Sequence, residues 1–345
     1  MIIVAVATAA RVSRHPLGTI MERRRFLQAI SVISAGLAAY TLIPDAESQD
    51  YDDPQDVYAA LRQPPDLRLP VEGGTISVVI ARGALQLDRL RMASWIQRSA
   101  VAVSSYFGRF PVNQMRLLLV PGSGDHIGPA TTWGFNGSVT CLHVGHAVSD
   151  AALRNDWVMV HEMVHLALPN LPRRSEWLLE GNATYVEPIA RAQAGQITPQ
   201  EVWRWAIEDM PKGQPQAGDL GLDHTHTWAR TYWGGAMFWL LAELAIYKKS
   251  AGRYRLQDAL RAINRSSGGN TSAWSVDQVA DAGDAAVHTD ALASLYAQLK
   301  DRPVDIDLHD VLKQLGVSEG DGVIRFDDNA PLSRLRRSIT TATAA

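Results

Sequence analysis

Two histidines, His161 and His165, stand four residues apart with Glu162 between them. On an α-helix, residues four apart lie on one face one turn apart, so both imidazoles can reach a single ion. Glu162 lies beside them and can reach a water molecule at that ion. Apolar residues surround the motif at helical spacing and Pro169 follows it, which predicts a buried or cleft-lining helix ending after His165. The alternative interpretation is a helix with two partly exposed histidines.

A zinc site needs a third protein ligand and an open fourth position. The next candidate stretch, residues 175–187, places Glu180 and Glu187 seven apart on one helix face. We expect Glu180 to be the ligand and Glu187 to accept a hydrogen bond from a ligand histidine, which would fix its tautomer. Cys141 is the only cysteine, which excludes a cysteine-based zinc site and an internal disulfide.

These residues carry a family resemblance. The motif at 161–165, followed by Trp177-Leu-Leu-Glu180-Gly-Asn-Ala-Thr-Tyr-Val-Glu187, resembles the gluzincin metallopeptidases, and most closely their aminopeptidase N-like and glycyl aminopeptidase-like branches. Downstream, Thr231-Tyr232-Trp-Gly-Gly-Ala236 is similar to a Tyr-Glu-Lys-Gly-Ala segment of those families. The resemblance covers roughly residues 140–250.

The resemblance implies a zinc-dependent peptidase with one Zn²⁺ per chain, bound by His161, His165 and Glu180. Glu162 would act as the general base, and Tyr232 would donate a hydrogen bond to the oxyanion of the transition state. His226 is an alternative donor, because a histidine plays this role in thermolysin-like gluzincins. The substrate would be a peptide or protein.

The chain also departs from these branches. Fourteen residues separate His165 from Glu180, a shorter spacing than in the aminopeptidase N branch, and the large β-domain of that branch has no room. No glutamate occurs between Glu72 and Glu162, where the aminopeptidases place an edge strand with a glutamate that binds the substrate's amino group. The stretch expected there is 133–143, whose strand edge can still bind a peptide backbone.

The expected elements are strands and helices in the N-terminal part of the chain and mainly helices in the C-terminal part. Strands are expected at 75–81, 115–120 and 138–144, and a helix at 85–107. From residue 150 onward we expect mainly helices, at 150–168, 176–194, 199–207, 228–248, 254–264, 276–281, 289–300, 308–315 and 332–338, with a small strand at 322–326. This order predicts an α+β fold, and with the resemblance a thermolysin-like one of two lobes. Residues 71–170 would form a small β-containing lobe that ends in the motif helix, and residues 171–345 a helical lobe.

The first residues indicate export. Arg23-Arg24-Arg25-Phe26-Leu27-Gln28, an apolar run at 29–43 and a small-residue exit resemble a twin-arginine signal, which predicts a periplasmic protein. The alternative is an inner-membrane anchor at 29–43, although that run is shorter than the roughly 20 residues a spanning helix needs. We expect residues 1–48 to be a leader with translation starting at Met21, and the Pro-rich residues 49–70 to be a linker.

Other features narrow the class of protein. The formal charge of −3 argues against a nucleic-acid-binding protein. The apolar segment 228–246 contains Arg230 and Glu243, which favours a buried core helix over a membrane span. His143 and His146 are more simply strand-edge histidines than a second metal site. Two functional alternatives remain open: a non-catalytic binding or envelope-maintenance relative, and a zinc hydrolase of an ester or epoxide. The sequence does not indicate the oligomeric state.

Overall fold

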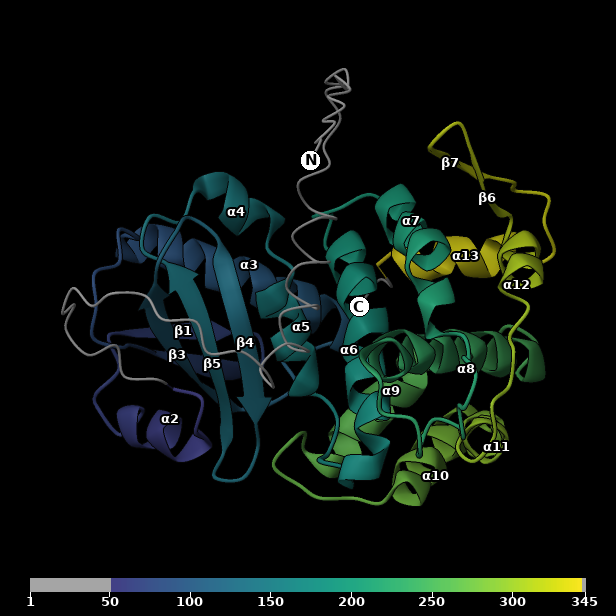
Figure 1. Cartoon of the computed structure of the whole chain (residues 1–345), viewed down its shortest axis with the longest axis horizontal. Coiled ribbons are helices and arrows are strands. Elements are labelled where there is room, and N and C mark those ends of the chain that lie inside the picture. The colour runs from purple at the N-terminus through teal and green to yellow at the C-terminus, as the bar shows by residue number, and fades with distance from the viewer. Residues whose placement is uncertain (1–50, 343–345) are drawn as a thin grey trace, which may run out of the picture. The chain divides into compact units, whose positions relative to one another are not determined.

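Five strands form a mixed sheet at the start of the region that the computed structural model describes, residues 51–342 (Figure 1). The strands are β1 (Leu67–Val71), β2 (Gly74–Ile80), β3 (Gln114–Gly122), β4 (Ile127–Trp133) and β5 (Ser138–Gly145). Their order is β1-β2-β3-β5-β4, with β2, β3 and β5 parallel and both edge strands antiparallel to their neighbours. Three of the four predicted strands are therefore β2, β3 and β5, and all three lie at the centre of the sheet.

The edge strand β4 was not predicted from the sequence, and the expectation of an edge strand at 133–143 was wrong, because that stretch contains most of β5, which pairs on both sides. Gly128 and Pro129 lie inside β4 and hide its pattern, because both residue types normally argue against a strand. Proline is tolerated here because an edge strand needs hydrogen bonds on one side only. In this strand Thr132 stands directly opposite Thr140 of β5.

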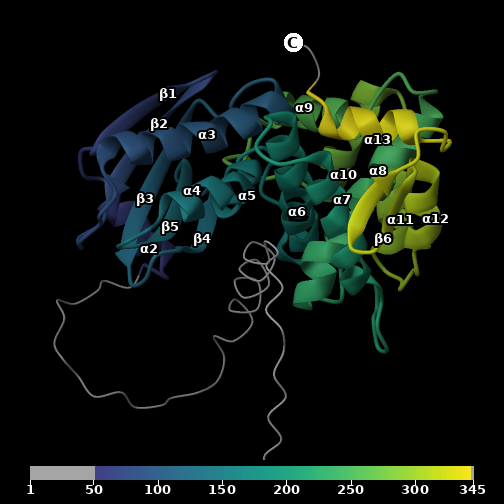
Figure 2. The same cartoon turned by 90° about the horizontal axis from the view of Figure 1, so that it is seen from above.

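Helices cover both faces of the sheet (Figure 2). Helix α3 (Arg89–Phe107), capped at its start by Asp88, packs on one face. On the other face lies α2 (Pro54–Ala60), whose Val57 joins a buried cluster with Leu118 and Cys141. The expectation of a linker at 49–70 was therefore wrong, since α2 and β1 lie in this stretch. Asp53 caps the helix, and Pro54 is its first residue. This pattern is typical of the start of a helix, but the prediction took the prolines as a sign of irregular chain.

The predicted helix at 150–168 is two helices, α4 (Asp150–Asn155) and α5 (Val158–His165). The break comes at Asp156, which follows the last residue of the first helix. Its side chain accepts hydrogen bonds from the backbone N–H groups of Val158, at 2.8 Å, and Met159. Trp95 of α3 donates to the same carboxylate at 2.7 Å. Asp156 therefore fixes the beginning of the helix that carries both histidines.

The remaining chain is mainly helical, as predicted, and Figure 1 shows α5 between the sheet and this helical part. Its elements are η1 (Arg173–Ser175), α6 (Glu176–Gln193), α7 (Pro199–Glu208), η2 (Met210–Gly213), η3 (Arg230–Gly234), α8 (Gly235–Lys249), α9 (Leu256–Ser267), α10 (Val276–Val287), α11 (Ala291–Leu299), α12 (Leu308–Leu315), the hairpin β6 (Val317–Gly320) and β7 (Val323–Phe326), and α13 (Ser333–Thr340). All described residues belong to one compact unit. Within the described residues the fold is α+β.

Helices α6 and α8 approach each other very closely. A Cβ atom on Gly235 would lie 2.1 Å from the carbonyl oxygen of Trp177, and one on Gly181 would lie 2.3 Å from the carbonyl carbon of Gly235. Only glycine at both positions permits this contact. The crossing matters for the site because α6 carries Glu180 and α8 continues directly from the segment that carries Tyr232.

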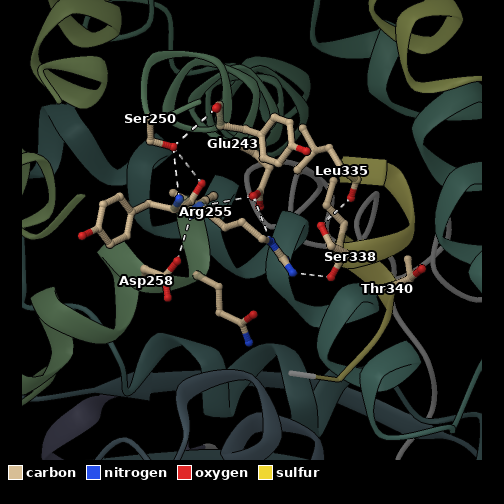
Figure 3. A network of polar contacts seen from close by, with 12 residues as sticks. Glu243, Ser250, Arg255, Asp258, Leu335, Ser338 and Thr340 are labelled. Carbon is tan, nitrogen blue, oxygen red and sulfur yellow. Dashed lines mark hydrogen bonds and ion pairs between the residues drawn. The ribbon is translucent and has the colours of Figure 1, made fainter. Parts of the chain in front are cut away.

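A buried arginine fastens the C-terminal helix to the helical part (Figure 3). Arg255, at the start of α9, pairs with Glu243 of α8 at 3.4 Å and donates to the backbone carbonyl of Ser338 in α13. Glu243 also accepts from the backbone of Leu256 at 3.2 Å. This network explains why an apolar segment such as α8 contains a glutamate.

None of the helices in the described region is long and apolar enough to span a membrane. This agrees with the prediction that residues 228–246 form a core helix, since most of α8 is buried. The predicted leader, the start at Met21 and the apolar run at 29–43 lie outside the described residues.

Candidate metal centre

Two helices bring three potential ligand atoms together. Oε2 of Glu180 on α6 lies 3.3 Å from Nε2 of His161 and 3.4 Å from Nε2 of His165, both on α5. All three ligand atoms lie within 4.8 Å of one another. Among the described residues, this is the one cluster of His, Cys, Asp or Glu side chains close enough to hold a metal ion. The sequence predicted the same three residues.

The distances fit a zinc ion. Zinc takes imidazole nitrogen and carboxylate oxygen at about 2.0–2.2 Å in tetrahedral geometry, which separates neighbouring ligand atoms by roughly 3.3–3.5 Å. Both separations from Glu180 Oε2 fall in that range. The donor set of two imidazoles and one carboxylate is also one that zinc prefers, and it leaves a fourth position open. The residues present therefore fit a catalytic type of zinc site.

The charges of the three groups depend on one another. Burial would raise the pKa of Glu180, but the neighbouring His165 and His161 lower it well below its usual range. Burial would lower the pKa of His165, but the Glu180 carboxylate outweighs it and raises that pKa to about 9. The pocket therefore holds a carboxylate anion that strongly attracts positive charge, whether a proton or a metal cation.

Glu162 lies on the same helix and is buried. Its Oε2 atom accepts a hydrogen bond from the hydroxyl of Thr132 on β4 at 2.8 Å. Burial raises the pKa of Glu162, while the two histidines act in the opposite direction. A carboxylate with a raised pKa is better suited to taking and returning a proton near neutral pH.

Tyr232 also lies at this centre. It belongs to η3, a π-helical turn, which is a form often found at functional sites. Its ring stacks on that of His161, with centroids 6.2 Å apart and an interplanar angle of 19°. Burial and the nearby carboxylates, Glu180 first among them, raise the pKa of Tyr232 well above its usual value, so its hydroxyl remains a hydrogen-bond donor.

His226, the alternative donor, is exposed. It lies near Glu176, one turn before Glu180. Burial raises the pKa of Glu176, and His226 acts in the opposite direction. The stacking on His161 favours Tyr232 over His226 as the donor.

Glu187 is fully buried and lies seven residues, about two helical turns, after Glu180. Its Oε1 atom pairs with Arg191 at 2.9 Å. Nδ1 of His161 is buried without a hydrogen-bond partner among the described residues. The role expected for Glu187 towards a ligand histidine therefore stays a prediction.

A separate buried carboxylate positions the start of α6. Asp223 accepts hydrogen bonds from the indole of Trp177 and the hydroxyl of Tyr296, each at 2.7 Å. It also contacts the hydroxyl of Ser175 at 3.3 Å. Because Trp177 lies one turn before Glu180, this anchor helps to fix the third ligand. Sequence reasoning missed Asp223, Asp156 and Thr132, since each acts across elements whose contacts no local pattern reveals.

Comparison with known proteins finds likeness in structure alone. No family profile and no curated protein sequence matches the chain. An aminopeptidase N family protein from Idiomarina loihiensis aligns with a TM-score of 0.53 at 15% identity, over 73% of this chain and 49% of that one. An M1 zinc metallopeptidase from Deinococcus radiodurans aligns with a TM-score of 0.43 at 14% identity, over 70% and 53%. The chain therefore spans about half the length of these proteins, and the first likeness shows a shared fold.

Proposed function

We propose that this chain is a zinc-dependent peptidase of the gluzincin type. One observation carries the proposal: the side chains of His161, His165 and Glu180, predicted from the sequence, converge, and both histidine nitrogens lie at separations from Glu180 Oε2 that fit a tetrahedral zinc ion. The shared fold with an aminopeptidase N family protein supports it independently.

Each residue at the centre has a part in the chemistry. Zinc, when bound, supplies a Lewis acid that polarises the scissile carbonyl and lowers the pKa of water. Glu162 takes a proton from the attacking water and returns it to the leaving amine. Tyr232 donates its hydroxyl hydrogen to the oxyanion, which stabilises the transition state by about 3 kcal/mol in comparable sites.

The edge of the sheet offers a place for the substrate backbone. Among the described strands β4 pairs with β5 alone, so its other edge can add an extended peptide beside Glu162. Residues 127–133 include no carboxylate that would bind a substrate's amino group. We therefore expect the protein to cleave peptides with blocked amino termini as well as free ones, and matched acetylated and free peptides test this.

Variants at Glu162 and Tyr232 test the function. With zinc bound, Glu162→Gln should lower kcat roughly 10²–10⁴-fold, and Tyr232→Phe should lower it about 10²-fold. Tyr247→Phe, at the far end of α8, serves as the control and should leave the rate unchanged. Full turnover by Glu162→Gln would contradict the general-base role. Zinc binding without cleavage of any peptide would favour a non-catalytic relative, and cleavage of esters alone would favour the other alternative.

We further propose that the protein is exported through the twin-arginine-like signal, with cleavage near residue 48. Fractionation of cells and N-terminal sequencing of the mature protein test this. An uncleaved chain in the inner membrane would favour the anchor alternative.

A further inference from the structure

A pair of threonine hydroxyls connects the sheet to Glu162. The hydroxyl oxygen of Thr132 lies 2.8 Å from Oε2 of Glu162 and 3.2 Å from the backbone carbonyl oxygen of the same residue. It also lies 2.8 Å from the hydroxyl oxygen of Thr140, its partner across the two strands. Thr140 is fully buried, and Thr132 is partly buried.

The hydrogen count gives this chain of contacts a direction. A carboxylate can only accept hydrogen bonds, so when Glu162 is ionised Thr132 must donate its single hydroxyl hydrogen to Oε2. Thr140 then donates to Thr132. When Glu162 has taken a proton from the water on its other oxygen, Oε1, the unprotonated Oε2 still accepts from Thr132, so both hydrogen bonds keep their direction. The same three oxygens are therefore satisfied in both protonation states.

The arrangement also selects one carboxylate oxygen. Oε2 faces Thr132, and no hydrogen bond to Oε1 is found among the described residues. Holding one oxygen against the sheet leaves the other to meet the reacting water. A carboxylate on a helix flanked by two ligand histidines can otherwise rotate about its side-chain torsions, which spreads its position over several rotamers.

We propose that Thr132, supported by Thr140, is a positioning residue that holds the Glu162 carboxylate in one orientation through both halves of the proton transfer. The proposal rests on the proposed function, in which Glu162 is the general base. Thr132 would then be a functional residue on β4, the edge strand beside which the peptide substrate is proposed to bind. The competing interpretation is that the threonines stabilise only the pairing of β4 with β5.

Kinetics on the zinc-loaded protein separate the two interpretations. Thr132→Val keeps the shape but removes the hydroxyl, and we expect kcat to fall roughly 10- to 100-fold with KM changed less than about twofold. Thr132→Ser restores the hydroxyl and should recover most of kcat. Thr75→Val, at a partly exposed position of strand β2 away from β4, is the matched control and should keep full kcat.

A double variant tests whether Thr132 acts through Glu162. In the Glu162→Gln background, Thr132→Val should cause no further loss of kcat, because the group that it positions is gone. An equal loss in both backgrounds, or a kcat of Thr132→Val that matches Thr75→Val, would overturn the proposal.

Crystal structures provide a readout that does not depend on turnover. In Thr132→Val the Glu162 carboxylate should leave its position or occupy two rotamers, with the zinc content unchanged. A carboxylate that stays in place would overturn the positioning role even if kcat falls. If the wild-type protein binds zinc but cleaves no peptide, the proposed function fails, and this structural comparison alone decides the role of Thr132.

Discussion

Replacing Gly235 by alanine should destabilise the protein, although helix propensity alone predicts the opposite. Alanine is favoured over glycine inside a helix by about 1 kcal/mol. Here the added Cβ would lie 2.1 Å from the carbonyl oxygen of Trp177, more than about 1 Å inside van der Waals contact. That oxygen belongs to the backbone of α6, so no side chain can rotate away. The two helices must separate along their contact.

Such overpacking costs roughly 1–3 kcal/mol and sometimes more, and a backbone clash this deep belongs at the upper end of that range. A cost of about 3 kcal/mol less the gain of about 1 kcal/mol leaves a net loss of about 2 kcal/mol, which lowers Tm by roughly 3 °C in a chain of this size. Because α6 carries Glu180 and Tyr232 precedes α8, kcat should also fall. Denaturant unfolding and calorimetry measure the effect, with Gly122→Ala as the control, since a Cβ there meets its nearest atom at 3.8 Å. A Gly235→Ala protein as stable as the wild type would refute the reasoning.

Two further predictions concern buried carboxylates. Burial raises the pKa of Asp156 to about 6. The folded state therefore binds more protons than the unfolded state between about pH 4 and 6, so this residue's contribution to stability falls as pH rises through that window. Asp156→Asn should remove this pH dependence from the free energy of unfolding. An unchanged dependence of the unfolding free energy on pH would contradict the prediction. Asp223→Ala should destabilise the protein by about 2–3 kcal/mol because it leaves buried donors unpaired, whereas Asp301→Ala, at an exposed ion pair with His224, should have a much smaller effect. Equal effects of the two changes in urea unfolding would argue against the anchor.

The sequence predicted the site better than the frame around it. His161, His165 and Glu180 were predictable because four-residue helical spacing and a matching downstream motif determine which side chains can meet. The central strands and most helices were likewise predictable from their periodicity. Each of these features depends on residues close together in the chain.

What could not be predicted depends on contacts across the fold. Strand β4 was missed because Pro129 is excluded from a strand only when both edges are paired, and pairing is not visible in the sequence. The contact between Thr132 and Glu162 depends on the register of that strand. The break at Asp156 was missed because the apolar spacing continues through it, while Trp95 of a distant helix helps to hold the carboxylate that starts α5.

The zinc content of the purified protein tests the central claim most directly. Elemental analysis of the wild type should give about one zinc per chain. His161→Ala should lose that zinc, and the exposed His309→Ala should retain it. A wild-type protein without zinc after gentle purification and zinc supplementation, or a His161→Ala protein that keeps its zinc, would contradict the account.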